Sequence, residues 1–285
     1  MNLTSPSQVK SWCIENGFHP SRALGQNFLI DRNVLDAIVD ASGVRAGQRA
    51  LEIGPGLGVL TEALLQKGAL VTAVEKDHRL AEHLSNTMGE FDLHVMEADA
   101  LELSLDDLFT PPFDCCVSNL PYSTGTRILL DFARHPAAPK TITVLVQTEV
   151  AERFAAQEGA EARGQAGVWL QLDYDVTLVR SVKASCFWPR PEIASTLVRL
   201  DRHSCPLKPE ERRCFESLTR HAFMHRRKQL GATLRKAPPP FGRSDETLAR
   251  LFAAVGVDAQ SRAETLSNEQ WLKLAQAFAG GEYDD

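Results

Sequence analysis

The sequence predicts an α/β protein with a mostly parallel sheet, an antiparallel edge and a small all-α C-terminal domain. Within residues 50–157, short apolar runs alternate with amphipathic segments, which is typical of parallel strands joined by crossover helices. Two strand-like runs, 168–182 and 195–200, then follow with no helical pattern between them, which predicts antiparallel strands. From Glu210 the chain is helical in character. With the polar segment 201–210 as a linker, we expect domains over 1–203 and 204–285.

The elements follow in order along the chain. A short helix and a basic loop are expected in residues 1–22, and a helix over 31–41 with Asp31 as its N-cap. The predicted strands are 50–53, 70–75, 93–99, 113–119 and 141–147. The helices that follow them are predicted at 57–67, 77–88, 126–133 and 149–157. The strand over 113–119 must stop because Pro121 has no N–H to donate to a sheet.

Composition limits the class of protein. The chain has 285 residues, a net charge of −6 and no apolar run long enough to cross a membrane. Its six cysteines form no CxxC pair and no zinc-type cluster, so we expect free thiols in a reducing compartment. The expectation is a cytoplasmic monomer without a metal and without a membrane partner. The acidic balance leaves room for one local basic patch.

Polar residues and glycines follow successive predicted strands. Gly54 opens a glycine-rich turn after the first strand, Glu75 ends the second, Asp99 ends the third and Asn119 ends the fourth. Each alone has a bland explanation, such as a turn that needs glycine or a solvated carboxylate. Carboxyl ends of parallel strands meet at one edge, where ligands bind. The ordered set therefore indicates a site for a nucleoside-containing cofactor.

This set resembles the class I S-adenosylmethionine-dependent methyltransferases, which have a Rossmann-like sheet. The segment "NLPY" (119–122) resembles the motif of enzymes that methylate an amino nitrogen. Four further segments narrow the resemblance to the ribosomal RNA adenine N6-dimethyltransferase family: "LGQNFLID" (24–31), "EIGPGLG" (52–58), "FWPRPEIASTLVRL" (187–200) and "HRRK" (225–228). The likeness runs from about Arg22 to Ala275. It implies N6-dimethylation of two adjacent adenines near the 3′ end of small-subunit rRNA, linked to small-subunit assembly, with the rRNA or a precursor particle as partner.

The resemblance assigns roles to particular residues. For S-adenosyl-L-methionine it implies that Asn27 and Leu29 cover the methionine end, Gly54 lines the turn, Glu75 holds the ribose, Asp99 meets the adenine and Asn119 lies beside the methyl group. The alternative for Leu29 is a side chain that plugs the core, and both can hold. No metal is implied.

The catalytic roles follow from the chemistry of adenine N6, whose lone pair is delocalised into the ring. The Asn119 oxygen and a backbone carbonyl at Leu120 or Pro121 would accept the N6 hydrogens. Tyr122 would stack on the target base, and the family pattern places Phe187 on its other face. The alternative for Tyr122 is a cap on the sheet edge.

The stretch 220–236 contains no acidic residue and is the candidate for RNA binding. We expect a helix there, with an apolar face and a basic face. The residues assigned to RNA are Arg22, Arg220, Arg226, Arg227 and Lys228. The alternative is a solvated helix face.

Two other functions stay open. One is the antibiotic-resistance type of large-subunit rRNA adenine methyltransferase, and the other is an assembly or transcription factor that binds RNA without catalysis. The intact strand-end residues argue against lost catalysis. The sequence departs from the family pattern at Ser123-Thr124, Glu192 and Ala194, which concerns RNA contacts more than methyl transfer.

Overall fold

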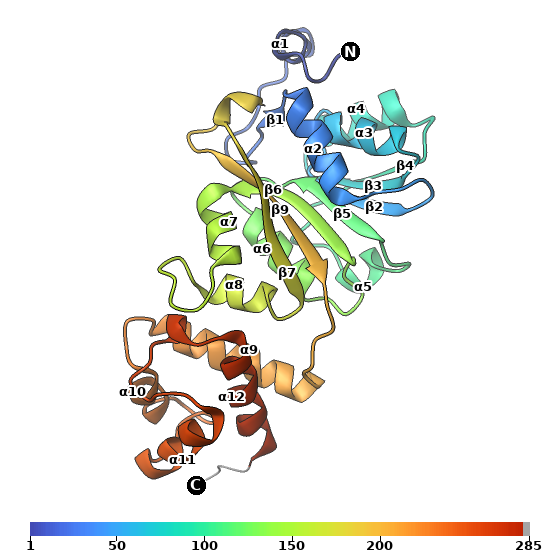
Figure 1. Ribbon diagram of the computed structural model, residues 1–285. Coiled ribbons are helices and arrows are strands. Elements are labelled where there is room, and N and C mark those ends of the chain that lie inside the picture. Colours follow the sequence, from blue (N-terminus) through green and yellow to red (C-terminus); the bar gives the residue numbers. More distant parts are fainter. Residues whose placement is uncertain (282–285) are drawn as a thin grey trace. The chain divides into compact units, whose positions relative to one another are not determined.

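The computed structural model describes residues 1–281, which form two compact units (Figure 1). The first unit comprises Met1–Ala151 and Tyr174–Arg202, and the second comprises Glu152–Asp173 and, within the described chain, residues 203–281. One junction lies between Arg202 and His203, one residue before the expected boundary. Residues 152–173, which were expected in the first domain, belong to the helical unit.

The first unit is built on a seven-stranded sheet. Its strands are β2 (Arg49–Ile53), β3 (Leu70–Glu75), β4 (Leu93–Glu97), β5 (Cys115–Asn119), β6 (Thr141–Gln147), β7 (Tyr174–Val182) and β9 (Ser195–Arg202). They lie in the order β4-β3-β2-β5-β6-β9-β7. The first five are parallel, whereas β9 runs antiparallel to both β6 and β7. The predicted mostly parallel sheet with an antiparallel edge is therefore confirmed.

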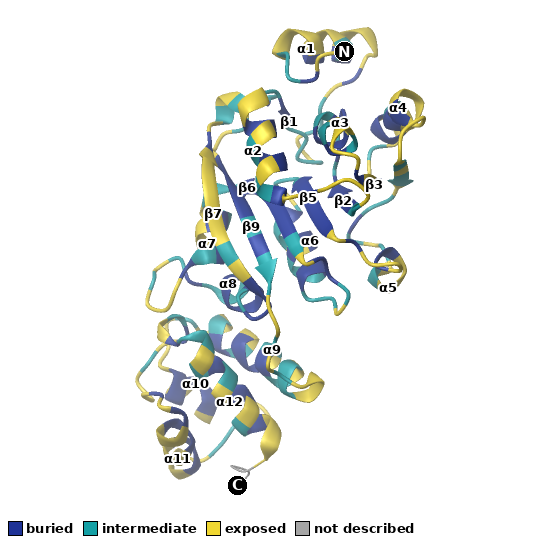
Figure 2. Ribbon diagram, turned by 45° about the vertical axis from the view of Figure 1, so that its right-hand side comes forward, coloured by how far each residue is buried: buried dark blue, intermediate teal, exposed yellow. Residues whose placement is uncertain are grey.

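Helices cover both faces of this sheet. The helical elements of the first unit are α1 (Pro6–Glu15), α2 (Arg32–Ser42), α3 (Val59–Gln66), α4 (His78–Met88), α5 (Leu105–Leu108), α6 (Gly125–Ala133) and the 3-10 turn η1 (Ala184–Cys186). In Figure 2, α2 crosses in front of the strands and α6 lies behind them. The predicted cap of α2 is confirmed, since the Asp31 carboxylate accepts from the Val34 N–H at 3.0 Å.

The strands of the seven-stranded sheet differ in how far they are buried. Strands β5 and β9 are mostly buried, and the edge strand β7 is mostly exposed (Figure 2). A second, two-stranded sheet joins β1 (Phe28–Leu29) to β8 (Phe187–Trp188). This pairing was not predicted, because two-residue strands carry no periodicity. It ties the segment before α2 to the segment before β9.

The second unit is helical. Helix α7 (Thr148–Ala155) leads into it, and its further elements are α8 (Gln165–Leu170), α9 (Pro209–Met224), α10 (Leu230–Arg235), α11 (Asp245–Val255), η2 (Ala263–Thr265) and α12 (Asn268–Gly280). The expected helical C-terminal region is present. Two details were wrong: residues 168–170 belong to helix α8 rather than to a strand, and the chain between Met224 and Leu230 is a turn rather than a continuous helix.

Packing explains why α8 is helical. A short apolar run such as 168–172 is compatible with either a strand or a buried helix. Here a Cβ on Gly167 would lie 2.3 Å from the Arg153 carbonyl oxygen, so the start of α8 packs directly on the end of α7. Trp169 then donates its ring N–H to the Thr219 hydroxyl at 2.9 Å. These contacts bury α8 against α7 and α9.

The described residues contain no membrane-spanning helix, no metal-binding cluster and no disulfide. Within residues 1–281, no helix is long and apolar enough to cross a membrane. The described part of the chain also contains no group of three or more His, Cys, Asp or Glu residues arranged to hold a metal. All six cysteines are free thiols.

Candidate active site at the strand ends

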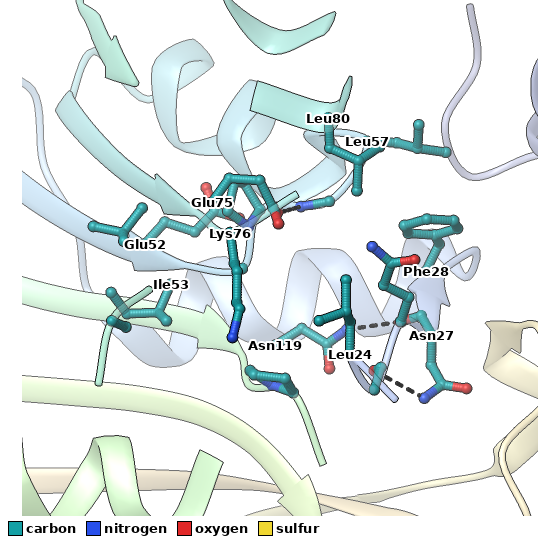
Figure 3. Close-up of a pocket in the computed structure, with 18 of the residues that line it drawn as sticks. Leu24, Asn27, Phe28, Glu52, Ile53, Leu57, Glu75, Lys76, Leu80 and Asn119 are labelled. Atoms are coloured by element: carbon teal, nitrogen blue, oxygen red, sulfur yellow. Dashed lines mark hydrogen bonds between the residues drawn. The ribbon is translucent and has the colours of Figure 1, made fainter. Parts of the chain in front are cut away.

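A pocket lies at the carboxyl ends of β2, β3 and β5 (Figure 3). It is lined by residues from the glycine turn, the strand ends and the segment 23–29. Of the residues assigned from the sequence, the lining includes Asn27, Leu29, Gly54, Glu75, Asp99, Asn119 and Pro121. The sheet topology therefore brings Gly54, Glu75, Asp99 and Asn119 together, because parallel strands end at one edge, and the segment 23–29 adds Asn27 and Leu29.

The glycine turn carries the backbone through the left-handed region. Gly54 and Gly56 have φ values of 66° and 60°, which glycine adopts without strain. A Cβ on Gly56 would lie 3.0 Å from the Phe28 ring, so β1 packs closely on this turn. The turn is thus fixed from one side and open to the pocket on the other.

Glu75 is held by backbone groups at the end of β3. Its side chain is buried, and its two oxygens accept from the Gly56 N–H at 3.1 Å and from the Asp77 N–H at 2.9 Å. Burial raises the pKa of this carboxyl, and the backbone hydrogen bonds oppose that rise. Each carboxylate oxygen has a further lone pair, so Glu75 can also accept from ligand hydroxyls.

Asp99 lies two residues beyond the end of β4. Its Oδ1 accepts from the Leu101 N–H at 3.0 Å, and its Oδ2 lies 2.6 Å from the Lys76 ammonium. The hydrogen bond from Lys76 is the main reason why the pKa of Asp99 is lowered. Lys76 itself lines the pocket, and the sequence reasoning did not assign it.

Asn119 ends β5 with its side chain in a fixed orientation. Its Nδ2 donates to the Asn27 backbone carbonyl at 3.0 Å, and its Oδ1 is buried with no hydrogen-bond partner among the described residues. Buried side-chain oxygens in native proteins are almost always paired. The pocket (Figure 3) therefore presents an acceptor that is ready for a ligand donor.

The backbone carbonyls of Leu120 and Pro121 differ in whether they already accept hydrogen bonds. The Pro121 oxygen already accepts from the Gly125 N–H at 2.7 Å and from the Thr124 N–H at 3.3 Å, at the start of α6. Within the described chain, no hydrogen bond reaches the Leu120 carbonyl oxygen. Of the two alternatives, Leu120 is the carbonyl that remains available.

Tyr122 and Phe187 are neighbours but not parallel. Their ring centroids lie 6.5 Å apart at an angle of 73°, an edge-to-face contact. Phe187 is 2% exposed and belongs to the core cluster that includes Leu29. The Tyr122 hydroxyl shares a hydrogen bond with the Ser195 hydroxyl. Neither ring belongs to the pocket lining, and no parallel slot for a base lies between them.

Glu52 is a pocket residue that the sequence reasoning missed. It lies within β2 at 1% exposure, and its Oε2 accepts from the Thr61 hydroxyl at 2.6 Å. Burial raises its pKa to about 8, the Thr61 hydrogen bond opposes the rise, and the nearby Glu75 adds to it. The available signal was an acid inside an otherwise apolar strand, where an unpaired charge is costly.

The residues assigned to RNA divide into two sets. Arg226 donates to the Glu161 carbonyl oxygen and lies 3.6 Å from the Glu264 carboxylate. Arg227 and Lys228 are exposed and form no ion pair within the described chain. Arg220 is also exposed, with its guanidinium 5.5 Å from the Trp169 ring centroid. Arg22 is exposed in the first unit.

The sheet order, with antiparallel β9 between β6 and β7, and the pocket at the strand ends define the class I methyltransferase fold. The chain belongs to the ribosomal RNA adenine dimethylase family, whose model matches residues 17–280.

Relatives and solved structures agree with this family. The chain is 40% identical to ribosomal RNA small subunit methyltransferase A of Opitutus terrae, over 96% of this chain and 98% of the relative. It is 39% identical to the protein of that name from Mycobacterium avium, over 98% and 89%. A dimethyladenosine transferase from Plasmodium falciparum superposes with a TM-score of 0.75 at 25% identity, over 86% and 95% of the two chains. The 23S rRNA methyltransferase ErmE gives a TM-score of 0.67 at 26% identity, over 88% and 98%.

Proposed function

We propose that this protein transfers methyl groups from S-adenosyl-L-methionine to the N6 atoms of two adjacent adenines near the 3′ end of small-subunit rRNA. The product would be N6,N6-dimethyladenosine, formed during small-subunit assembly in the cytoplasm. Family membership and relatives named for the small subunit support the substrate. The observation that carries the chemistry is the buried Oδ1 of Asn119, which has no hydrogen-bond partner among residues 1–281.

The geometry around Asn119 suits activation of an amino group. The bond from Nδ2 to the Asn27 carbonyl fixes the amide group, so Oδ1 is the end that is left to accept from a ligand. Oδ1 and the Leu120 carbonyl oxygen would accept the two N6 hydrogens, which draws the nitrogen toward tetrahedral geometry and frees its lone pair. Pro121 fixes the backbone so that the neighbouring carbonyl keeps its direction. Most of the rate would come from such positioning.

The pocket also fits the proposed cofactor. Glu75 retains acceptor capacity for ribose hydroxyls, and Asp99 presents a carboxylate at the adjacent strand end. When bound, the cofactor supplies an electrophilic methyl group on a sulfonium. Asn27 and Leu29, on the segment that lines the opposite wall, would exclude water from the methionine end.

Recognition of the RNA is assigned to the half-buried Tyr122 and to basic side chains at the surface. Tyr122 would stack on the target adenine, and Phe187 packs against its ring edge-to-face. Arg220, Arg227 and Lys228 would contact phosphates in the second unit, and Arg22 in the first. Arg226 is already engaged by Glu161 and Glu264, so its proposed contribution to phosphate binding is the smallest.

The large-subunit alternative shares the fold, as the likeness to ErmE indicates. The test is therefore a scan of both rRNAs. Small-subunit and large-subunit particles lacking the modification are incubated with protein and cofactor, followed by primer extension and nucleoside mass spectrometry. We expect N6,N6-dimethyladenosine in the small-subunit rRNA only. Modification of the large-subunit rRNA, or methylation of another base, would overturn the proposal.

A further inference from the structure

Ser195 is a fully buried serine whose hydroxyl meets a residue of the proposed active site. It begins β9, is 0% exposed, and its Oγ lies 2.5 Å from the Tyr122 hydroxyl oxygen. The sheet register fixes its backbone, since Ser195 lies opposite Gln147 of β6 and Val182 of β7. The hydroxyl is thus a rigid point 73 residues away in sequence from the ring that it contacts.

The same segment touches Tyr122 a second time. Phe187, eight residues before Ser195, meets the tyrosine ring edge-to-face with the centroids 6.5 Å apart, an arrangement that aromatic quadrupoles favour. Gly25 approaches the other end of the residue, because a Cβ there would lie 2.9 Å from the Tyr122 nitrogen. The tyrosine is therefore held at its backbone, its ring and its hydroxyl.

We propose that Ser195 is a positioning residue for methyl transfer, and that its hydroxyl fixes the Tyr122 ring in the orientation on which the target adenine stacks. This inference rests on the proposed function. A free tyrosine side chain would populate several rotamers, and ordering it upon RNA binding would lower affinity. A ring that is already fixed by the fold avoids that loss.

The experiment measures kcat/KM for the small-subunit particle and, separately, cofactor affinity by titration calorimetry. Ser195→Ala should lower kcat/KM by up to about tenfold, as expected for one lost hydrogen bond, and leave cofactor affinity within about twofold. Tyr122→Phe should lose a similar factor. Both changes remove the same hydrogen bond, the one between Tyr122 and Ser195. The kcat/KM of the double variant should therefore be little lower than that of the worse single variant.

Thr143→Val is the matched control. The Thr143 hydroxyl is also buried in the sheet, on β6, and it has no hydrogen-bond partner in the described structure. This variant should have the kcat/KM and the cofactor affinity of the wild type. If it loses activity as Ser195→Ala does, buried hydroxyls in this sheet matter generally and the positioning role is overturned.

The outcomes separate the two proposals. A wild-type protein that makes no N6,N6-dimethyladenosine would remove the proposed function, and the role of Ser195 with it. An active wild type with unchanged kcat/KM in Ser195→Ala, or with fully additive losses, would overturn the inference alone. A parallel loss of cofactor affinity would also overturn it, because Ser195 would then support the fold rather than the ring.

Discussion

The side-chain amide of Asn119 has a hydrogen bond at its nitrogen but none at its oxygen within the described chain. Its nitrogen is bonded to the Asn27 carbonyl, whereas its buried oxygen has no partner in the described structure. We predict that Asn119→Ala keeps cofactor affinity largely intact and lowers the methylation rate about 10²–10³-fold, comparable to removal of one transition-state hydrogen bond. Single-turnover methylation and calorimetric titration with the cofactor check this. Losses of the same size in both measurements would place Asn119 in cofactor binding instead of catalysis.

The raised pKa of Glu52 leads us to predict that the stability of the protein depends on pH. Burial raises the pKa of this carboxyl from 4.5, the ordinary value for glutamate, to about 8 in the folded protein. Because the folded pKa is raised, the folded state binds this proton more tightly than the unfolded state does. The resulting stability is fully present below pH 4.5 and is lost as the pH rises toward 8.

The test compares wild type with Glu52→Gln, which keeps an acceptor for Thr61 but cannot ionise. Between pH 5 and pH 8 the free energy of unfolding of the wild type should fall relative to that of the variant, by at most roughly 1 kcal/mol per pH unit, the slope for one proton. Urea unfolding at several pH values measures the difference. Parallel stability curves would show that Glu52 does not titrate in this range.

At the scale of elements, the segment 23–29 covers the pocket and must approach the "NLPY" backbone closely. Gly25 has a φ of 67°, and a Cβ there would lie 2.9 Å from the Tyr122 nitrogen, a backbone atom that cannot move aside alone. We predict that Gly25→Ala displaces this segment, disturbs the bond between Asn27 and Asn119, and lowers methylation about tenfold or more, as small displacements in an active site do.

Gly17→Ala is the control for this prediction. Gly17 also has a positive φ, 55°, but nothing lies within 4 Å of its Cβ position. Both variants carry the backbone strain of a left-handed alanine, roughly 1–2 kcal/mol. Only Gly25→Ala should lose activity once both are assayed well below their melting temperatures. Equal losses would mean that strain, and not the close approach, is responsible.

At the scale of the whole molecule, an acidic chain carries one local basic turn. The net charge is −6, yet Arg227 and Lys228 are exposed beside each other between α9 and α10. Each phosphate contact releases counterions, so RNA affinity should fall with salt. We predict that Arg227→Gln with Lys228→Gln flattens the log–log salt slope by about 1.4 units for single-stranded RNA.

Arg226→Gln serves as the comparison within the same turn. Because Arg226 bonds to Glu161 and lies beside Glu264, this variant should lower the melting temperature and change the salt slope little. Affinity at several salt concentrations and thermal unfolding give both values. If Arg226→Gln flattens the slope as much as the double change, the division of roles within the turn is wrong.

Local sequence patterns were sufficient to predict much of the fold and the position of the pocket. Strands β3 and β6 have the predicted limits, Asp31 caps α2 as expected, and the strand-end residues Gly54, Glu75 and Asn119 lie together. These features depend on periodicity and capping, which act over a few residues. Because parallel strands end at one edge, a correct order of strands and helices also determines which side chains meet.

Tertiary structure alone decided the contacts between distant segments. Residues 168–170, expected as strand, lie in a helix whose Gly167 packs on Arg153 and whose Trp169 bonds to Thr219. The orientation of Asn119 depends on the Asn27 carbonyl, 92 residues away, and that of Tyr122 on Ser195. Such pairings are fixed by packing and burial across the folded chain. A local pattern specifies which residue ends a strand, but it cannot specify which distant atom that residue will meet.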